Sequence, residues 1–293
     1  MKDWKGINFK VIIRVIGFLL VIEGLFMFTG LPFSLYYCEE NCFALLYSGL
    51  ITLISGAILW FSTRNHPKNI AKKEGYVIVA ITWIIISLFG TLPFLISGAI
   101  PNFTDAFFET MSGFTTTGAT ILTDIEGMPK GILFWRSMTH WIGGMGIIVF
   151  TVAILPILGI GGMQLYAAEM PGVTKDKLHP RITATAKRLW GIYVIFTVVE
   201  TILLMLGGIN LFDALCHTFG TVATGGFSTH SESIAAFSPY IQYVIIIFMV
   251  LAGTNFTLHY LALHGQLRKV WRSEEFRYFL FLILIATAAI TIV

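Results

Sequence analysis

The sequence has few charged residues and few cysteines. Of its 293 residues, 12% are charged and 56% are hydrophobic, whereas soluble domains carry about 25% charged residues. This shortage of charge excludes an ordinary water-soluble domain and predicts an integral membrane protein. The 3 cysteines are too few for a disulfide framework or a cysteine-based metal site.

The sequence also lacks the motifs of common enzymes and nucleotide-binding proteins. It contains no His-Glu-x-x-His zinc signature, no Cys-x-x-Cys pair and no Gly-Lys-Ser/Thr of a phosphate-binding loop. The net charge is only +3, and the basic residues are spread over short loops. We therefore expect neither an enzyme nor a nucleic-acid-binding protein.

Long apolar runs predict an all-α polytopic membrane protein, because a spanning helix needs about 20 consecutive apolar residues. Clusters of basic residues separate these runs. The expected spans are residues 11–31, 43–62, 76–98, 131–158, 189–207 and 239–263, with a further apolar run from Tyr278 onward.

Two helix-like segments are too short to cross a bilayer, and each is followed by threonine and glycine. The first covers residues 102–114 and the second begins at Asn210. We expect re-entrant half-helices that enter the membrane and return as extended chain. Backbone without helical hydrogen bonds is tolerated at that depth only inside protein or against a water-filled cavity.

The two short segments form an internal repeat with a constant offset of 108 residues. Residues 102–106 align with 210–214, and 115–120 align with 223–228 without a gap. Gly118 then aligns with Gly226, although a slip of one residue would align it with Gly225 instead. The repeat favours paired filter loops over ordinary Thr/Gly turns.

The basic residues predict the orientation of the chain. If both short segments return to the face they came from, all of the 19 lysines and arginines except Lys130 and Arg136 fall on one side. The positive-inside rule places that side, with the N-terminus, in the cytoplasm. Both Thr/Gly loops then open towards the outer face.

Six strings of the sequence carry a family resemblance. They are SGFTTTGAT (112–120), WIGGMG (141–146), AILP (153–156), GGMQL (161–165), TGGFSTH (224–230) and NFTLHY (255–260). With these strings the chain resembles the TrkH branch of the Trk/Ktr/HKT potassium transporters. The resemblance implies helix–half-helix–helix repeats around one pore in a bacterial or archaeal cytoplasmic membrane, with K⁺ as the transported ion.

The resemblance also implies partners and a site. The expected partners are membrane lipid, a second copy of the chain in a homodimer, and a cytosolic TrkA-type nucleotide-binding regulatory subunit. The expected K⁺ ligands are mainly the backbone carbonyls of the two filter loops. The residues concerned are Thr116, Thr117, Gly118, Ala119, Thr224, Gly225, Gly226 and Phe227.

We expect five regions along the chain, with two complete pore repeats among them. An inactive fragment or accessory membrane subunit is the alternative to a potassium-uptake subunit, because a third repeat stops within its first helix. The regions are two N-terminal helices (1–73), a first pore repeat (74–165), a cytoplasmic linker (166–187), a second pore repeat (188–265) and the start of a third (266–293).

Several polar residues and glycines have both a structural and a functional interpretation. Asp105 and Asp213 are expected to be helix N-caps, and could also attract ions. A structural hydrogen bond is expected for Glu109, and isolated polar contacts or vestibule tuning for His217 and His230.

Glu23 and Glu200 lie inside spans, where a buried contact or a functional role applies. Gly143, Gly144 and Gly146 suit either helix packing or clearance below a filter.

Overall fold

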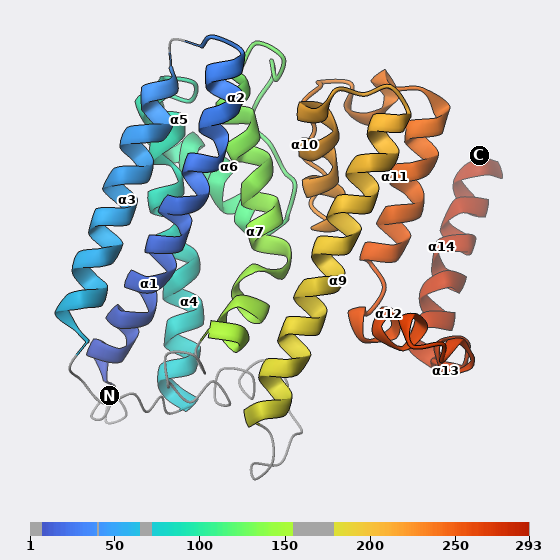
Figure 1. The fold of residues 1–293 in the computed structure, drawn as a ribbon. Helices are drawn as coiled ribbons and strands as arrows, with labels where there is room; N and C mark the ends of the chain where they lie inside the picture. Colours follow the sequence, from blue (N-terminus) through green and yellow to red (C-terminus); the bar gives the residue numbers. More distant parts are fainter. Residues whose placement is uncertain (1–7, 40, 65–71, 155–178, 293) are drawn as a thin grey trace.

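The computed structural model describes residues 8–39, 41–64, 72–154 and 179–292, and the regular elements in these ranges are all helical. Figure 1 shows the helices standing side by side, with the start of helix α1 (Phe9–Met27) at the opposite end from the half-helices α6 (Phe103–Phe114) and α10 (Leu211–Val222). The expected all-α fold is therefore confirmed. The expected boundary between residues 165 and 166 lies outside the described residues.

The first N-terminal helix pairs closely with the next long helix. Helix α1 (Phe9–Met27) continues through η1 (Phe28–Gly30) into α2 (Leu31–Tyr36), and α3 (Cys42–Ser62) packs against α1. A β-carbon on Gly17 would lie 2.8 Å from the carbonyl oxygen of Gly56. Small residues allow backbones to approach in this way inside a membrane.

The first repeat contains α4 (Lys72–Gly90), α5 (Leu92–Ser97), α6 (Phe103–Phe114) and α7 (Lys130–Ile154). The single span expected at 76–98 is divided at Thr91, because Pro93 has no backbone N–H to continue the helical hydrogen bonds. The break separates α4 from the short helix that leads to α6.

The second repeat contains α9 (His179–Leu206), α10 (Leu211–Val222), η2 (Ser233–Ala236) and α11 (Pro239–Ala252). Helix α9 begins inside the segment that was expected to be a linker. Helices α12 (Phe256–Leu263), α13 (Leu267–Arg272) and α14 (Glu274–Ile292) follow.

The expectation of one span over 239–263 is wrong, because the helix ends at Ala252 and resumes as α12. Figure 1 shows α12 lying across the direction of α11. The carbonyl oxygen of Leu251 lies 2.8 Å from Nε2 of His259. The Thr254 N–H donates to the same oxygen at 3.1 Å, so two contacts satisfy this carbonyl at the end of α11.

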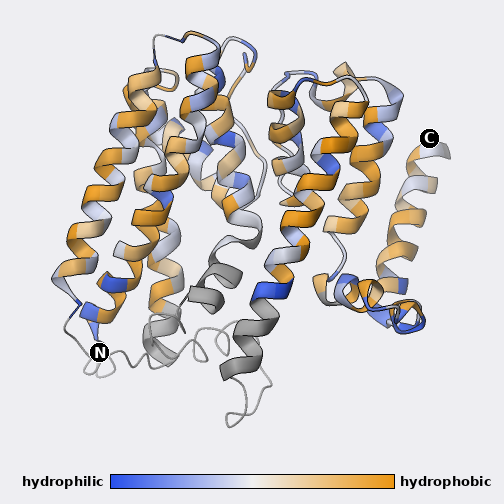
Figure 2. Ribbon diagram, viewed as in Figure 1, coloured by the Kyte–Doolittle hydropathy of each residue, from blue (hydrophilic) through white to orange (hydrophobic). Residues whose placement is uncertain are grey.

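Among the described residues, four helical stretches are long and apolar enough to cross a membrane by length and composition, and they cover Phe9–Tyr36, Cys42–Ser62, Ala80–Ser97 and Lys187–Leu206. Apolar residues run along the exposed sides of α3, α9 and α11 (Figure 2). Such wide apolar faces suit contact with lipid, whereas the outer face of a soluble helix is polar.

Helix α7 lies at the centre of the largest apolar cluster and contacts both half-helices. The ring centroid of Phe134 lies 4.5 Å from the ring centroid of Phe33 in α2 and 5.6 Å from that of Phe219 in α10. Trp135 is buried, and its indole N–H donates to the carbonyl oxygen of Gly90 at 3.0 Å. One helix therefore fixes the position of α6 relative to α10.

Candidate functional site

The two half-helices begin with the same type of cap. The side-chain oxygen of Asn102 accepts a hydrogen bond from the Thr104 N–H at 2.8 Å, and that of Asn210 accepts from the Asp213 N–H at 2.9 Å. Both asparagines have extended backbone angles, as N-cap residues do. The expectation that Asp105 and Asp213 are the caps is wrong. Both aspartates lie in the first helical turn, where the helix dipole favours a negative charge.

The half-helices also end in the same way, at an offset of 108 residues. After α6, the N–H groups of Thr116 and Thr117 donate to the carbonyl oxygens of Gly113 and Ser112. After α10, the corresponding N–H groups of residues 224 and 225 donate to the carbonyl oxygens of residues 221 and 220. Each pair of bonds closes the helix and turns the chain into its loop.

Positive φ angles recur at matched positions in the two loops. Thr116 and Thr224 have φ of 54° and 58°, and Gly118 and Gly226 have φ of 76° and 89°. Gly225 corresponds to Thr117 and is not among the positive-φ residues. The backbone therefore pairs Gly118 with Gly226, the gap-free one of the two alignments that the sequence left open.

The two loops touch at their glycines. A β-carbon on Gly118 would lie 1.9 Å from the carbonyl oxygen of Gly225, and one on Gly225 would lie 2.5 Å from the His140 ring. A β-carbon on Gly226 would meet nothing within 4 Å. The structure thus brings the loops of the two repeats together and backs the second loop with α7.

Each loop is held at its far end by a side chain from its own half-helix. Glu109 accepts hydrogen bonds from the hydroxyl of Thr120 at 2.8 Å and from the N–H of Ile121 at 3.0 Å. In the second repeat, Nε2 of His217 lies 3.0 Å from the hydroxyl oxygen of Ser228. The structural hydrogen bond expected for Glu109 is confirmed.

A buried arginine joins the two repeats, and the sequence reasoning missed its role. Nε of Arg136 donates to Glu109 at 2.7 Å, and Nη1 donates to the carbonyl oxygen of Ser228 at 3.0 Å. Arg136 and Glu109 are each 1% exposed. An arginine inside a long apolar run marks a position with a partner, and this was the signal that could have identified Arg136.

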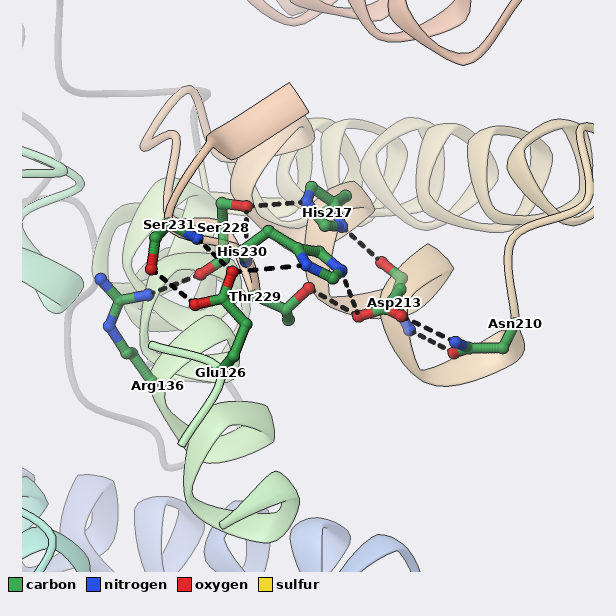
Figure 3. Close-up of polar contacts among 9 residues, drawn as sticks. All are labelled: Glu126, Arg136, Asn210, Asp213, His217, Ser228, Thr229, His230 and Ser231. Carbon is green, nitrogen blue, oxygen red and sulfur yellow. Dashed lines mark hydrogen bonds and ion pairs between the residues drawn. The ribbon is translucent and has the colours of Figure 1, made fainter. Parts of the chain in front are cut away.

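At the mouth of the site, His230 lies between carboxylates from both repeats (Figure 3). Its Nδ1 lies 3.6 Å from Glu126, and its Nε2 lies 3.9 Å from Asp213. The hydroxyl and N–H of Ser231 donate to Glu126 at 2.5 and 2.8 Å. These hydrogen bonds lower the pKa of Glu126 from its ordinary 4.5 to about 2. The exposed segment that follows the first loop, which contains Glu126, is thus hydrogen-bonded to Ser231, just after the second loop.

Two of the α7 glycines permit close packing against the ends of the half-helices. A β-carbon on Gly143 would lie 2.0 Å from the carbonyl oxygen of Phe114, and one on Gly144 would lie 2.7 Å from Cα of Ala223. The packing interpretation of these two glycines is confirmed. Gly146 instead lines a small cavity, where Glu23 also lies.

The second loop borders a cavity of about 340 Å³ beside α11. Thr224, Gly225 and Gly226 of the loop and Ile245 and Met249 of α11 are among the residues that line it. The described residues contain no group of three or more His, Cys, Asp or Glu side chains that could hold a metal ion. The polar atoms of residues 116–119 and 224–227 are main-chain groups and threonine hydroxyls.

This arrangement defines a class of membrane protein in which matched half-helices end in loops of threonine and glycine. The family model described as "Cation transport protein", TrkH, matches residues 42–293. The chain belongs to the TrkH family of cation transport proteins. The match begins at Cys42, the first residue of α3, so α1 and α2 lie outside it.

Proteins from two bacteria are similar in sequence to this chain over most of its length. The chain is 47% identical over 279 residues to the Trk system potassium uptake protein TrkH of Escherichia coli K12, covering 93% of this chain and 57% of that protein. It is 43% identical over 282 residues to TrkH of Vibrio parahaemolyticus, covering 94% and 58%. These names describe transporters and not enzymes.

A solved structure has the same fold. The crystal structure of the potassium transporter TrkH from Vibrio parahaemolyticus matches with a TM-score of 0.80 and 39% identity, over 95% of this chain and 57% of that one. The chain therefore spans a little over half the length of the relatives that it matches.

Proposed function

We propose that the chain forms part of a K⁺ pathway in the cytoplasmic membrane, as the membrane subunit of a Trk-type potassium uptake system. In this proposal the ion is held mainly by backbone carbonyls of residues 116–119 and 224–227. The observation that carries it is the matched backbone of the two loops, with positive φ at Thr116 and Gly118 and again at Thr224 and Gly226.

The chemistry of such a loop follows from its backbone. In an ordinary strand successive carbonyls point to opposite sides. A positive φ at every second residue rotates the peptide groups, so that neighbouring carbonyls can face one side. A row of carbonyl oxygens can replace the hydration shell of K⁺ more readily than that of the more strongly hydrated Na⁺. Gly118 and Gly226 tolerate such angles because they have no β-carbon.

The hydroxyl of Ser112 donates to the carbonyl oxygen of Ala119 at 2.6 Å. This bond uses one lone pair of that oxygen and orients it, which leaves the second lone pair for an ion. In the second repeat the corresponding carbonyl, that of Phe227, lies over Gly220, where a β-carbon would come within 2.9 Å of it. The second loop thus packs against its half-helix at the position where the first loop is hydrogen-bonded to Ser112.

The proposal extends to the surroundings of the pathway. Further loops are needed to surround an ion, since a carbonyl site requires ligands on all sides. We place the N-terminus in the cytoplasm on the basis of the lysine and arginine distribution. A homodimer and a cytosolic TrkA-type nucleotide-binding subunit are proposed on family membership alone.

Complementation of a bacterium deficient in potassium uptake tests this function. The longest reading frame that contains the chain, and residues 1–293 alone, are expressed and their membrane insertion is verified. We expect the long form to restore growth at low K⁺ and to take up Rb⁺. Gly118→Ser and Gly226→Ser in that form should lower the K⁺/Na⁺ discrimination. Normal insertion without rescue by the long form would contradict the proposal and favour an accessory, non-conducting subunit.

A further inference from the structure

The far ends of the two loops are held by a repeated device in the half-helices. Glu109 and His217 are 108 positions apart, and each binds a hydroxyl eleven residues further along its own chain segment, that of Thr120 or Ser228. The same spacing with different chemistry indicates that both positions serve to hold the loop. A carboxylate in one repeat and an imidazole in the other cannot be two copies of one ion-binding group.

Arg136 connects these two attachments, because it binds a partner in each repeat. Its Nε binds the same carboxylate oxygen of Glu109 that holds Thr120, and its Nη1 binds the carbonyl oxygen of Ser228. Figure 3 shows the guanidinium reaching the second loop. Arginine suits this position because its donors are fixed in a planar fork, whereas lysine carries one flexible ammonium.

The ring of Phe227 adds a third contact to the same arginine. Cζ of Arg136 lies 3.6 Å from the centroid of this ring, and the His140 ring is stacked on it at 3.9 Å with an interplanar angle of 21°. Two groups this close to one centroid cover opposite faces of the ring. Phe227 is therefore enclosed by two side chains that are one turn apart on α7, and its N–H also faces Nδ1 of His140 at 3.4 Å.

The pair of charges has little net effect on an ion nearby. An unpaired guanidinium beside a cation pathway would repel K⁺, and burial would leave that repulsion weakly screened. Glu109 balances the charge of Arg136 at 2.7 Å. The arginine can thus bind the anchor of the first loop and the end of the second loop without repelling K⁺ from the pathway.

We infer that Arg136 is a positioning residue for ion selectivity, because it fixes the loop of the first repeat relative to the loop of the second. The inference rests on the proposed function of the loops. Discrimination by carbonyl oxygens depends on their number and placement, and these loops belong to different half-helices. Arg136 contacts the anchor of the first loop and the residue that follows the second.

Three variants of the longest reading frame test this inference. Arg136→Lys keeps the charge but cannot reach both partners with a fixed fork. The double variant Arg136→Gln with Glu109→Gln removes both charges together and leaves none unpaired. Trp135→Phe is the matched control, because Trp135 is equally buried and donates to Gly90 of α4 instead of to a loop.

Each variant is measured for abundance, melting temperature, inhibition of Rb⁺ uptake by Na⁺, and amide hydrogen exchange. We expect Arg136→Lys and the double variant to insert and to lose K⁺/Na⁺ discrimination by about tenfold. Amides at 120–122 and 228–230 should exchange faster together. Trp135→Phe should lower the melting temperature and leave discrimination unchanged.

Wild-type discrimination and exchange in both Arg136 variants would overturn the inference. So would an equal loss of discrimination in Trp135→Phe, because selectivity would then follow stability alone. If the wild-type protein does not transport K⁺, the proposed function fails. The exchange data then test separately whether Arg136 links the two loops. Faster exchange in both loops would support the link through Arg136, and faster exchange in the first loop alone would contradict it.

Discussion

Gly118 lies against Gly225 so closely that a β-carbon on Gly118 would come within 1.9 Å of the Gly225 carbonyl oxygen. Gly226, the counterpart of Gly118 in the second repeat, has open space at the same position. Two residues with matched backbone angles are therefore constrained to different degrees. Gly226 is constrained only by its positive φ, whereas Gly118 is constrained both by its positive φ and by the lack of space for a β-carbon.

Alanine substitutions at these two glycines should differ in severity. Gly226→Ala meets only the penalty of the left-handed conformation, about 1–2 kcal/mol. Gly118→Ala meets the same penalty and also displaces the backbone of the other loop. We expect a lower melting temperature and lower Rb⁺ uptake for Gly118→Ala. Equal effects of the two substitutions would show that the loops do not touch.

The caps of the half-helices give a second prediction. Asn102→Ala should destabilise the protein by about 1 kcal/mol, since it removes the acceptor for the Thr104 N–H. Asp105→Ala should cost less, because a first-turn charge contributes about 0.3–1 kcal/mol. Melting of the two purified variants provides the comparison. A larger loss for Asp105→Ala would restore the aspartate as the cap.

The hydrogen bonds between Ser231 and Glu126 should be insensitive to mild acid. The hydrogen bonds from Ser231 favour the charged form of Glu126 and lower its pKa to about 2. The contact is thus complete above pH about 4.5, the ordinary pKa, and is lost as the pH falls through about 2. The exchange protection of the Ser231 amide, corrected for intrinsic rates, should be constant from pH 7 to pH 5. Loss of protection in that range would contradict the assignment.

Glu23 gives a stability prediction. It is 3% exposed, and neither of its carboxyl oxygens has a hydrogen-bond partner among the described residues. Leaving a polar group buried in this way costs about 1–3 kcal/mol. Glu23→Leu should therefore raise the melting temperature. Leu19→Ala, which enlarges the adjoining cavity of about 40 Å³, should lower it. A lower melting temperature for Glu23→Leu would mean that the carboxyl has a stabilising partner.

The sequence predicted the features of the fold that repeat or that depend on composition. The half-helices and their loops could be found because two copies align without a gap, and the spans because apolar runs are long. The register of Gly118 and Gly226 needed backbone angles, since Gly225 and Gly226 are chemically identical in a sequence.

Features that depend on long-range contacts could not be predicted. Arg136 binds Glu109 and Ser228, which lie 27 and 92 positions away; its place in an apolar run indicates that it has a partner, but not which residues. His259 likewise reaches back across the break after Ala252 to the carbonyl oxygen of Leu251. No local pattern distinguishes such a histidine from one on the surface of a continuous helix.

The direct test of the account is to locate a heavy analogue of K⁺ by anomalous scattering in crystals of the longest reading frame soaked in Rb⁺ or Tl⁺. We predict a peak about 3 Å from backbone carbonyl oxygens of residues 116–119 and 224–227. This peak should weaken when K⁺ is present in excess and persist when Na⁺ is. A fully occupied ion elsewhere, with none beside these two loops, would contradict the account.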